Sequence, residues 1–388
     1  MGLELLFLLL PVAALSGWWL GRRGRTGGGA AAVPGIPADY LKGINYLLNE
    51  QPDKAIEVFI EMLEVNPDTV ETHLALGSLF RRRGEVDRAI RIHQNLIARP
   101  TLTGAQRAQA LYELGQDYLR AGLLDRAEAL FSELIDRGAH TEPALRCLLD
   151  IYEQEKDWEK AIDIARKLGT RSGEPMAARI AQYYCELAEQ EIRQGEPGRA
   201  QRLLKRALGA DPRCVRASLL EAELERRAGD FRAALKAYRR VELQNPEFVP
   251  EIVGPVRECL HQLGRDDEAL EYLTELETRY GATSAVLAVA DMLAQRDPGA
   301  AIDHLVHYLR ERPSVRGMDR LIALHLERAE GSARENLELL KGITDNLLRE
   351  KPIYRCGACG FTGRSLHWQC PGCRRWTTIT PVHGVEGE

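Results

Sequence analysis

The hydrophobic and polar positions of this chain follow two different patterns, one at the amino terminus and one over most of the rest. Residues 3–20, LELLFLLLPVAALSGWWL, are apolar apart from Glu4 at their edge. A helix of this length reaches about 27 Å, which is enough to cross a thin bilayer. We therefore expect a transmembrane helix over residues 1–21 rather than a core helix, because a helix that is apolar on all sides has little to pack on at a chain end.

Basic residues follow this apolar run and none precedes it. Arg22, Arg23 and Arg25 come directly after it, whereas a cleaved signal peptide would carry its Lys or Arg before it. Positively charged flanks stay in the cytoplasm. Residues 22–38, rich in Gly, Ala and Pro, predict a flexible linker. The expected layout is a single-pass membrane protein with its body on the cytoplasmic side, where thiols stay reduced.

Over residues 39–352 the helical pattern recurs in similar blocks, and each of eight blocks holds one alanine at an equivalent position. These alanines are 34, 38, 34, 39, 34, 35 and 32 residues apart: Ala55, Ala89, Ala127, Ala161, Ala200, Ala234, Ala269 and Ala301. Twelve positions before these alanines, small residues recur (Gly43, Gly77, Gly115, Ala188, Ala222). Five positions before the alanines, glycines recur (Gly84, Gly122, Gly195, Gly229, Gly264). The small residues would let two helices approach closely, and the glycines would support the turn between them.

A period near 34 residues resembles the tetratricopeptide repeat family. Eight units are visible, and residues 319–352 resemble a degenerate ninth helix pair. The resemblance predicts an all-α, superhelical solenoid whose concave surface binds protein segments. Extra residues around Pro100 and Leu168 predict either longer loops or a change of superhelical pitch.

The composition is that of a folded protein, and it limits the partners and activities that we expect. The chain has 388 residues, 28% of them charged, and a net charge of −5, which argues against nucleic acid as a partner. No catalytic motif is present, so we expect no enzyme and neither catalytic nor cofactor-binding residues. His304 and His307 lie one turn apart but are assigned to surface or packing positions. Single cysteines in the helical units are assigned to packing: Cys147, Cys185, Cys214 and Cys259.

The segment YRCGACGFTGRSLHWQCPGCRRW, residues 354–376, holds the remaining cysteines in two C-x-x-C motifs. Cys356, Cys359, Cys370 and Cys373 can supply four thiolates to one tetrahedral ion. Such a closed site has no position for a substrate. We therefore expect one structural metal ion per chain, with zinc favoured over iron, in a domain over residues 353–381 followed by a tail over 382–388.

This segment resembles a rubredoxin-like zinc ribbon, since CGACG and CPGC match its two metal knuckles. It departs from rubredoxins in its short spacer and in Arg374, which stands where a glycine is usual. Fewer than thirty residues cannot form a sufficient core without metal. We therefore expect the ribbon to dock on the array through Phe361, Trp368 and Trp376, next to the last helices.

The order of anchor, repeats and ribbon resembles the lipopolysaccharide assembly protein B family of Gram-negative bacteria. That resemblance implies a non-enzymatic inner-membrane adaptor in which both the repeats and the ribbon are needed. The implied partners are a membrane-anchored ATP-dependent zinc metalloprotease, the lipid A pathway deacetylase that it degrades, and an inner-membrane lipopolysaccharide sensor protein. The alternatives are an assembly platform for envelope enzymes, a rubredoxin-type redox carrier and a nucleic-acid-binding ribbon. Homo-oligomerisation is left open.

Overall fold

The computed structural model describes residues 38–49, 51–65, 70–385 and 387. The transmembrane helix predicted over residues 1–21 lies outside the described residues. So does the predicted linker over residues 22–38, except for Ala38, which begins the first described helix. Within the described part of the chain, no helix is both long and apolar enough to cross a membrane.

Consecutive helices pair as antiparallel neighbours, and the described residues hold nine such pairs, from α3–α4 to α19–α20. The helices are α3 (Ala38–Leu48), α4 (Pro52–Val65), α5 (Val70–Arg83), α6 (Val86–Ile97), α7 (Gly104–Arg120), α8 (Leu124–Asp136), α9 (Thr141–Glu155), α10 (Trp158–Ser172), α11 (Ala177–Arg193), α12 (Pro197–Ala210), α13 (Val215–Arg227), α14 (Phe231–Gln244), η1 (Pro246–Phe248), α15 (Val249–Gln262), α16 (Asp266–Tyr280), α17 (Thr283–Arg296), α18 (Pro298–Glu311), α19 (Val315–Leu326) and α20 (Gly331–Glu350).

The recurring alanines lie at the contact between the two helices of each pair. All eight are fully buried. A Cβ added to Gly43 would come within 2.6 Å of the Phe59 ring, and one added to Gly115 within 2.7 Å of the Phe131 ring. The small residues are therefore needed for close helix approach. This packing within the helix pairs confirms the predicted tetratricopeptide solenoid.

The turns between paired helices also follow the sequence pattern. The glycines five positions before the alanines all have positive φ, which only glycine adopts without strain: Gly84 (87°), Gly122 (74°), Gly195 (79°), Gly229 (81°) and Gly264 (68°). Near Pro100 the extra residues lengthen the loop between α6 and α7, which has six residues (98–103) against four between α8 and α9 (137–140), and they also lengthen α7. Near Leu168 the loop keeps four residues (173–176) and the helices are longer, so that α7 and α11 each have 17 residues against 14 in α5. The longer loop expected from the extra residues is therefore present near Pro100, whereas near Leu168 helix length changes instead.

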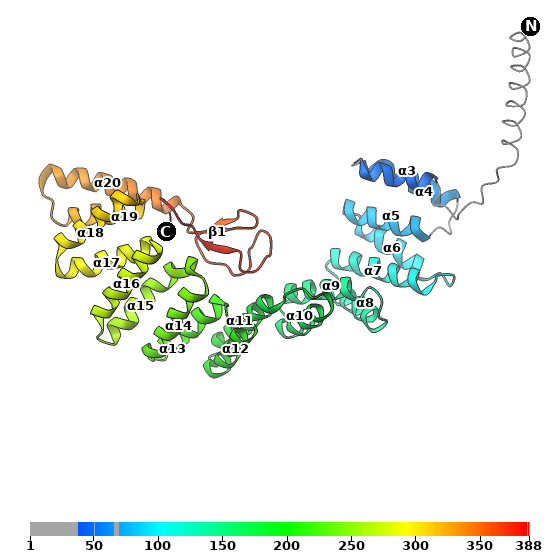
Figure 1. Ribbon diagram of the computed structural model, residues 1–388. Coiled ribbons are helices and arrows are strands. Elements are labelled where there is room, and N and C mark those ends of the chain that lie inside the picture. The colour runs from blue at the N-terminus through cyan, green and yellow to red at the C-terminus, as the bar shows by residue number, and fades with distance from the viewer. Residues whose placement is uncertain (1–37, 50, 66–69, 386, 388) are drawn as a thin grey trace, which may run out of the picture. The chain divides into compact units, whose positions relative to one another are not determined.

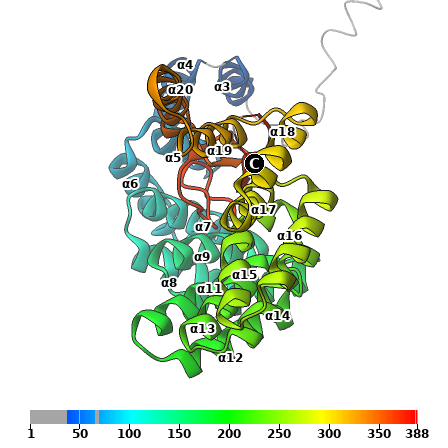
Figure 2. The same ribbon diagram turned by 90° about the vertical axis from the view of Figure 1, so that its left-hand side faces the viewer.

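The chain divides into two compact units, Met1–His140 and Thr141–Glu388. The first contains α3–α8, and the second contains α9–α20 and a small sheet. In Figures 1 and 2 the helices of the second unit form an arc, and the sheet lies on the inner side of that arc. The cysteine-rich segment is thus placed against the repeat helices of its own unit.

Three short antiparallel strands form the sheet, in the order β2-β1-β3. They are β1 (Tyr354–Cys356), β2 (Thr362–Gly363) and β3 (Ile379–Pro381). Cys356 at the end of β1 is opposite Ile379 of β3, and both side chains are buried. Together with Cys370 they form the core of the ribbon, which is too small to bury much else.

Candidate metal centre

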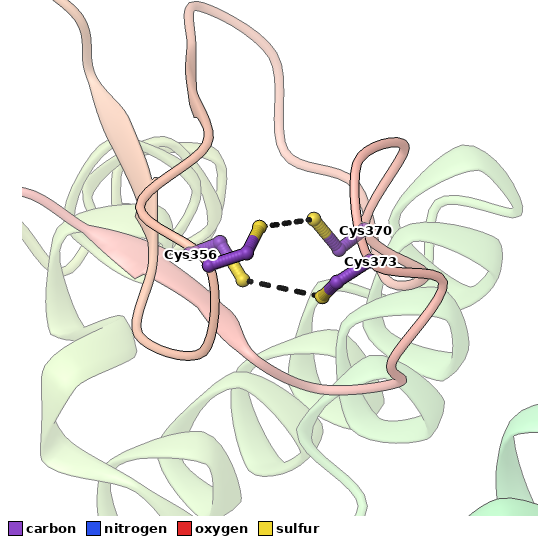
Figure 3. A group of neighbouring side chains, drawn as sticks. Cys356, Cys370 and Cys373 are labelled. Carbon is purple, nitrogen blue, oxygen red and sulfur yellow. Dashed lines mark hydrogen bonds between the residues drawn. The ribbon is translucent and has the colours of Figure 1, made fainter. Parts of the chain in front are cut away.

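The four cysteines of the two C-x-x-C motifs converge. Their sulfur atoms all lie within 4.8 Å of one another. The Cys356 and Cys373 sulfurs are 3.9 Å apart, and those of Cys359 and Cys370 are 3.6 Å apart. Figure 3 shows the labelled Cys356, Cys370 and Cys373 pointing toward one another from two facing loops. A tetrahedral ion with metal–sulfur bonds of about 2.3 Å would separate its sulfurs by about 3.8 Å. The four side chains therefore fit one metal ion.

The two loops that carry the cysteines have the same backbone conformation. The amide of Gly360 donates to the Cys356 carbonyl at 3.0 Å, and the amide of Arg374 donates to the Cys370 carbonyl at 2.8 Å. Both donors have positive φ, 78° at Gly360 and 57° at Arg374. Arg374 thus takes a left-handed conformation that suits glycine. A glycine at this position would take the same conformation without strain.

Hydrogen bonds to the Cys356 sulfur favour its thiolate. The Cys356 sulfur is hydrogen-bonded to the Thr378 hydroxyl at 3.2 Å, to which it donates as a thiol, and it accepts from the Ala358 amide at 3.4 Å. The Thr378 hydrogen bond is the main cause that lowers the pKa of Cys356 to about 6. These hydrogen bonds therefore favour the thiolate form that a metal ligand needs.

The ribbon docks on the repeat helices through Trp376. Its indole packs edge-on against Trp158 of α10 and Tyr183 of α11, with ring centroids 6.0 and 5.8 Å away. The Trp376 Nε1 donates to Glu153 of α9 at 2.9 Å. The same carboxylate accepts from Arg179 at 2.8 Å and from the Tyr183 hydroxyl. Trp376 therefore contacts three helices that belong to two neighbouring repeats.

A second contact lies farther along the array. Trp368 stacks on Phe248 of η1 with ring centroids 5.5 Å apart. The Tyr354 hydroxyl donates to Glu251 of α15 at 2.7 Å. Burial raises the pKa of Tyr354 above its ordinary value, and the Glu251 carboxylate adds to this, so the hydroxyl stays a donor. The ribbon thus bridges repeats that are not neighbours in the stack.

Two details of the expected docking were wrong. Phe361 packs within the ribbon, against its core and at 6.4 Å from the His367 ring, rather than on the array. The docking side chains reach α9–α11, η1 and α15 instead of mainly the last helices. The last helices contribute the amide of Val315, which donates to Val385 at 2.8 Å, and the Arg349 carbonyl, which accepts from Arg364. Nearness in sequence does not decide which helices the ribbon contacts, because the helices of the second unit curve around it (Figure 1).

The other candidate ligands do not form a site. Among the described residues, the ribbon cysteines are the one group of three or more side chains placed to share a metal. His304 lies 3.3 Å from Glu277, and His307 lies 3.9 Å from Glu311. The single cysteines of the helices are buried, as expected for packing residues. Sequence reasoning missed the repeat residues that hold the ribbon, because each occupies an ordinary helical position with no distinguishing motif: Glu153, Trp158, Tyr183, Phe248 and Glu251.

Comparison with known proteins matches both parts of the chain. A rubredoxin metal binding domain family matches residues 354–381, and a tetratricopeptide repeat family matches residues 40–102, 106–175 and 185–248. Lipopolysaccharide assembly protein B of Escherichia coli strain K12 is 41% identical over 387 residues, covering 99% of this chain and 100% of that protein. Its counterpart in Haemophilus influenzae is 36% identical over 394 residues, covering 99% of each chain. The chain therefore belongs to the lipopolysaccharide assembly protein B family.

Proposed function

We propose that this protein is a non-enzymatic adaptor that regulates lipopolysaccharide synthesis. In this proposal it promotes the proteolysis of the lipid A pathway deacetylase by a membrane-bound ATP-dependent zinc metalloprotease. An inner-membrane lipopolysaccharide sensor protein restrains it. The observation that carries the proposal is the match to lipopolysaccharide assembly protein B over 99% of the chain, which includes the repeats and the ribbon together.

The arrangement of the second unit suits an adaptor. A repeat array offers an extended surface to which protein segments can bind. Each repeat contacts only the repeats next to it in the stack. The ribbon adds contacts from α9 to α15, which restrict how these repeats move relative to one another. A surface held in one curvature binds a partner at a lower entropic cost than a flexible one. The ribbon would therefore support binding without itself carrying chemistry.

We also propose that Cys356, Cys359, Cys370 and Cys373 hold one structural ion, zinc in preference to iron. A bound ion would neutralise the thiolates and fix the two loops, since four protein sulfurs leave no position for a substrate. Thr378 and the knuckle amides hold the Cys356 sulfur in place for that ion. Elemental analysis of the purified full chain should give one zinc per chain, whereas iron with a reversible potential would support the redox-carrier alternative.

The proposed location is the inner membrane, with residues 1–21 as the anchor and the repeats and ribbon on the cytoplasmic side. The anchor would raise the local concentration of the array near membrane-bound partners. A reporter fused to the carboxyl end should be active in the cytoplasm. A periplasmic signal from the same fusion would contradict this topology.

Reconstitution with purified components tests the adaptor role. The metalloprotease and this chain would be placed in the same proteoliposomes, and the deacetylase would be added with ATP. We expect faster loss of the deacetylase with the chain than without it, and no acceleration of a control substrate of the same protease. Equal rates with and without the chain would favour the assembly-platform alternative.

A further inference from the structure

A groove lies between α10, α11 and α12 of the second unit, helices that are next to one another in Figure 1. Its volume is about 970 Å³. Small residues from α10 and α12 form part of its lining, among them Ala165, Gly169 and Gly209. Met176 and Ile180, both buried, contribute apolar surface at its base. The groove can therefore admit a polypeptide backbone close to the helices.

The groove lies on a different side of α11 from the docked ribbon. Tyr183 and Tyr184 are consecutive residues of α11, and successive residues of a helix point about 100° apart. Tyr183 contacts Trp376 of the ribbon, whereas Tyr184 lines the groove. The extra residues after Leu168 lie here, since α10 continues to Ser172 and ends at Gly173 with a φ of 71°. A ligand in the groove would thus leave the ribbon in place.

Basic side chains border the groove. Arg166 is on α10 and Arg206 is on α12. The Arg166 guanidinium donates to the Tyr184 hydroxyl at 2.6 Å and lies 3.9 Å from the exposed Asp163 carboxylate. The lining itself has one acidic residue, Glu174, which is paired with Arg146 at 2.8 Å. The lining therefore has more positive charge than its own carboxylates balance.

The surrounding surface extends this charge. Helix α12 contains no Asp or Glu, and three of its basic residues, Arg202, Lys205 and Arg206, are exposed. Lys167 and Arg171 of α10 are exposed as well. Concentrated positive charge in a protein whose net charge is −5 favours an anionic partner locally. Because the site is a groove with an apolar base rather than a flat face, it fits a chain better than a bilayer surface.

We propose that this groove binds an acidic, extended polypeptide segment of a partner protein. Carboxylates of the segment pair with Arg166 and Arg206, and its backbone and small side chains lie against the apolar base. The proposal goes beyond the adaptor role and stands whether or not the chain promotes proteolysis. It assigns the binding site by its chemistry and does not involve the metal.

Gly209 and Gly198 supply a matched pair of variants on the same helix. A Cβ at either position meets no other atom within 4 Å, so a large side chain can be added at both without disturbing the fold. Only Gly209 lines the groove. Gly209→Trp fills the groove while leaving every charge in place, and Gly198→Trp makes the same change outside it. Arg206→Glu reverses one wall charge.

The test uses the full chain in neutral phosphatidylcholine nanodiscs and a fluorescein-labelled decapeptide of alternating Glu and Ala. Fluorescence anisotropy should show salt-sensitive binding to the unaltered chain and to Gly198→Trp. Binding should weaken at least tenfold in Gly209→Trp and Arg206→Glu, and a Gln-Ala decapeptide should bind at least tenfold more weakly. Unchanged thermal midpoints would show that the variants are folded.

Three results would overturn the proposal. The first is that the unaltered chain does not bind the acidic peptide. The second is that Gly209→Trp binds it as well as Gly198→Trp does, which would mean that the peptide is attracted to the basic surface outside the groove. The third is that phosphatidylglycerol vesicles bind the unaltered chain and Gly209→Trp equally while displacing the peptide, which would identify the face as a membrane contact.

Discussion

Trp376 of the ribbon donates a hydrogen bond to Glu153 of α9 at 2.9 Å, although 223 residues separate them in sequence. The carboxylate is mostly buried and also accepts from Arg179. A buried charge needs such partners, because an unpaired one is costly to desolvate. This hydrogen bond therefore joins the metal-binding segment to the repeat array, and it also gives the buried Glu153 carboxylate one of its partners.

Replacing Trp376 by Ala should release the ribbon from the array without emptying it of metal. The change removes the indole contacts with Trp158 and Tyr183, at a cost of about 3 kcal/mol. Amide hydrogen exchange should become faster in residues 354–381 and in α9–α11, while the chain keeps its metal. Trp376→Phe keeps a ring and loses the hydrogen bond, so it should cost only about 1 kcal/mol. Unchanged exchange in Trp376→Ala would show that this docking contact contributes little.

Replacing Ala234 by Leu should destabilise the repeat array. Ala234 is fully buried between α13 and α14, so the larger side chain overpacks a tight contact at a cost of about 1 to 3 kcal/mol. Lys236→Leu, on the exposed side of the same helix, is the matched control and should change the thermal midpoint little. If both variants melt alike, the assignment of Ala234 to the helix interface fails.

Replacing Arg374 by Gly should stabilise the ribbon. The positive φ of 57° at Arg374 strains a side-chain-bearing residue by about 1 kcal/mol, and glycine removes that strain. Because metal binding and folding of so small a module are coupled, the gain should appear as tighter zinc binding in a competition with a chelator. Arg375→Gly, whose backbone φ is not positive, should instead weaken zinc binding or leave it unchanged.

Glu251 should make the stability of the second unit depend on pH. Burial raises the pKa of Glu251, and the hydrogen bond from Tyr354 opposes this only in part. A carboxyl group with a raised folded-state pKa stabilises the fold at low pH, and that contribution is lost as pH rises through the folded-state pKa. In zinc-saturated protein, Glu251→Gln should therefore gain stability relative to the unaltered chain between pH 5 and pH 8. A difference that is constant or falls with pH would contradict this.

The features that could be predicted from the sequence are those that depend on the spacing of residues along the chain. The alanine at each repeat is buried because a helix pair needs a small residue at its contact, and that need recurs with every unit. The positive φ of Gly84 and its equivalents follows from the same turn. The convergence of the four cysteines was likewise expected, since two C-x-x-C loops suit one tetrahedral ion.

The sequence could not predict which surfaces that are distant along the chain contact one another. Glu153 and Phe248 carry no signal that they face the ribbon, because the curvature of a stack decides which helices meet its inner side. Phe361 was assigned to docking by its hydrophobicity alone, yet the small ribbon uses it for its own packing. His93 shows the same limit. It takes the position of Phe59 and Phe131 in its repeat and is fully buried 2.5 Å from Asp117, which periodicity does not reveal.

The central claim is that the metal-bound ribbon is required for the adaptor role. Cys356→Ser removes one of four ligands and should unfold the ribbon, while the repeats remain helical because each is stabilised by its neighbours. The deciding measurement is the half-life of the lipid A deacetylase in cells whose only copy of this protein carries Cys356→Ser. The account predicts that the variant stays in the membrane without metal and that the deacetylase accumulates. Normal deacetylase turnover with a variant shown to be metal-free would contradict it.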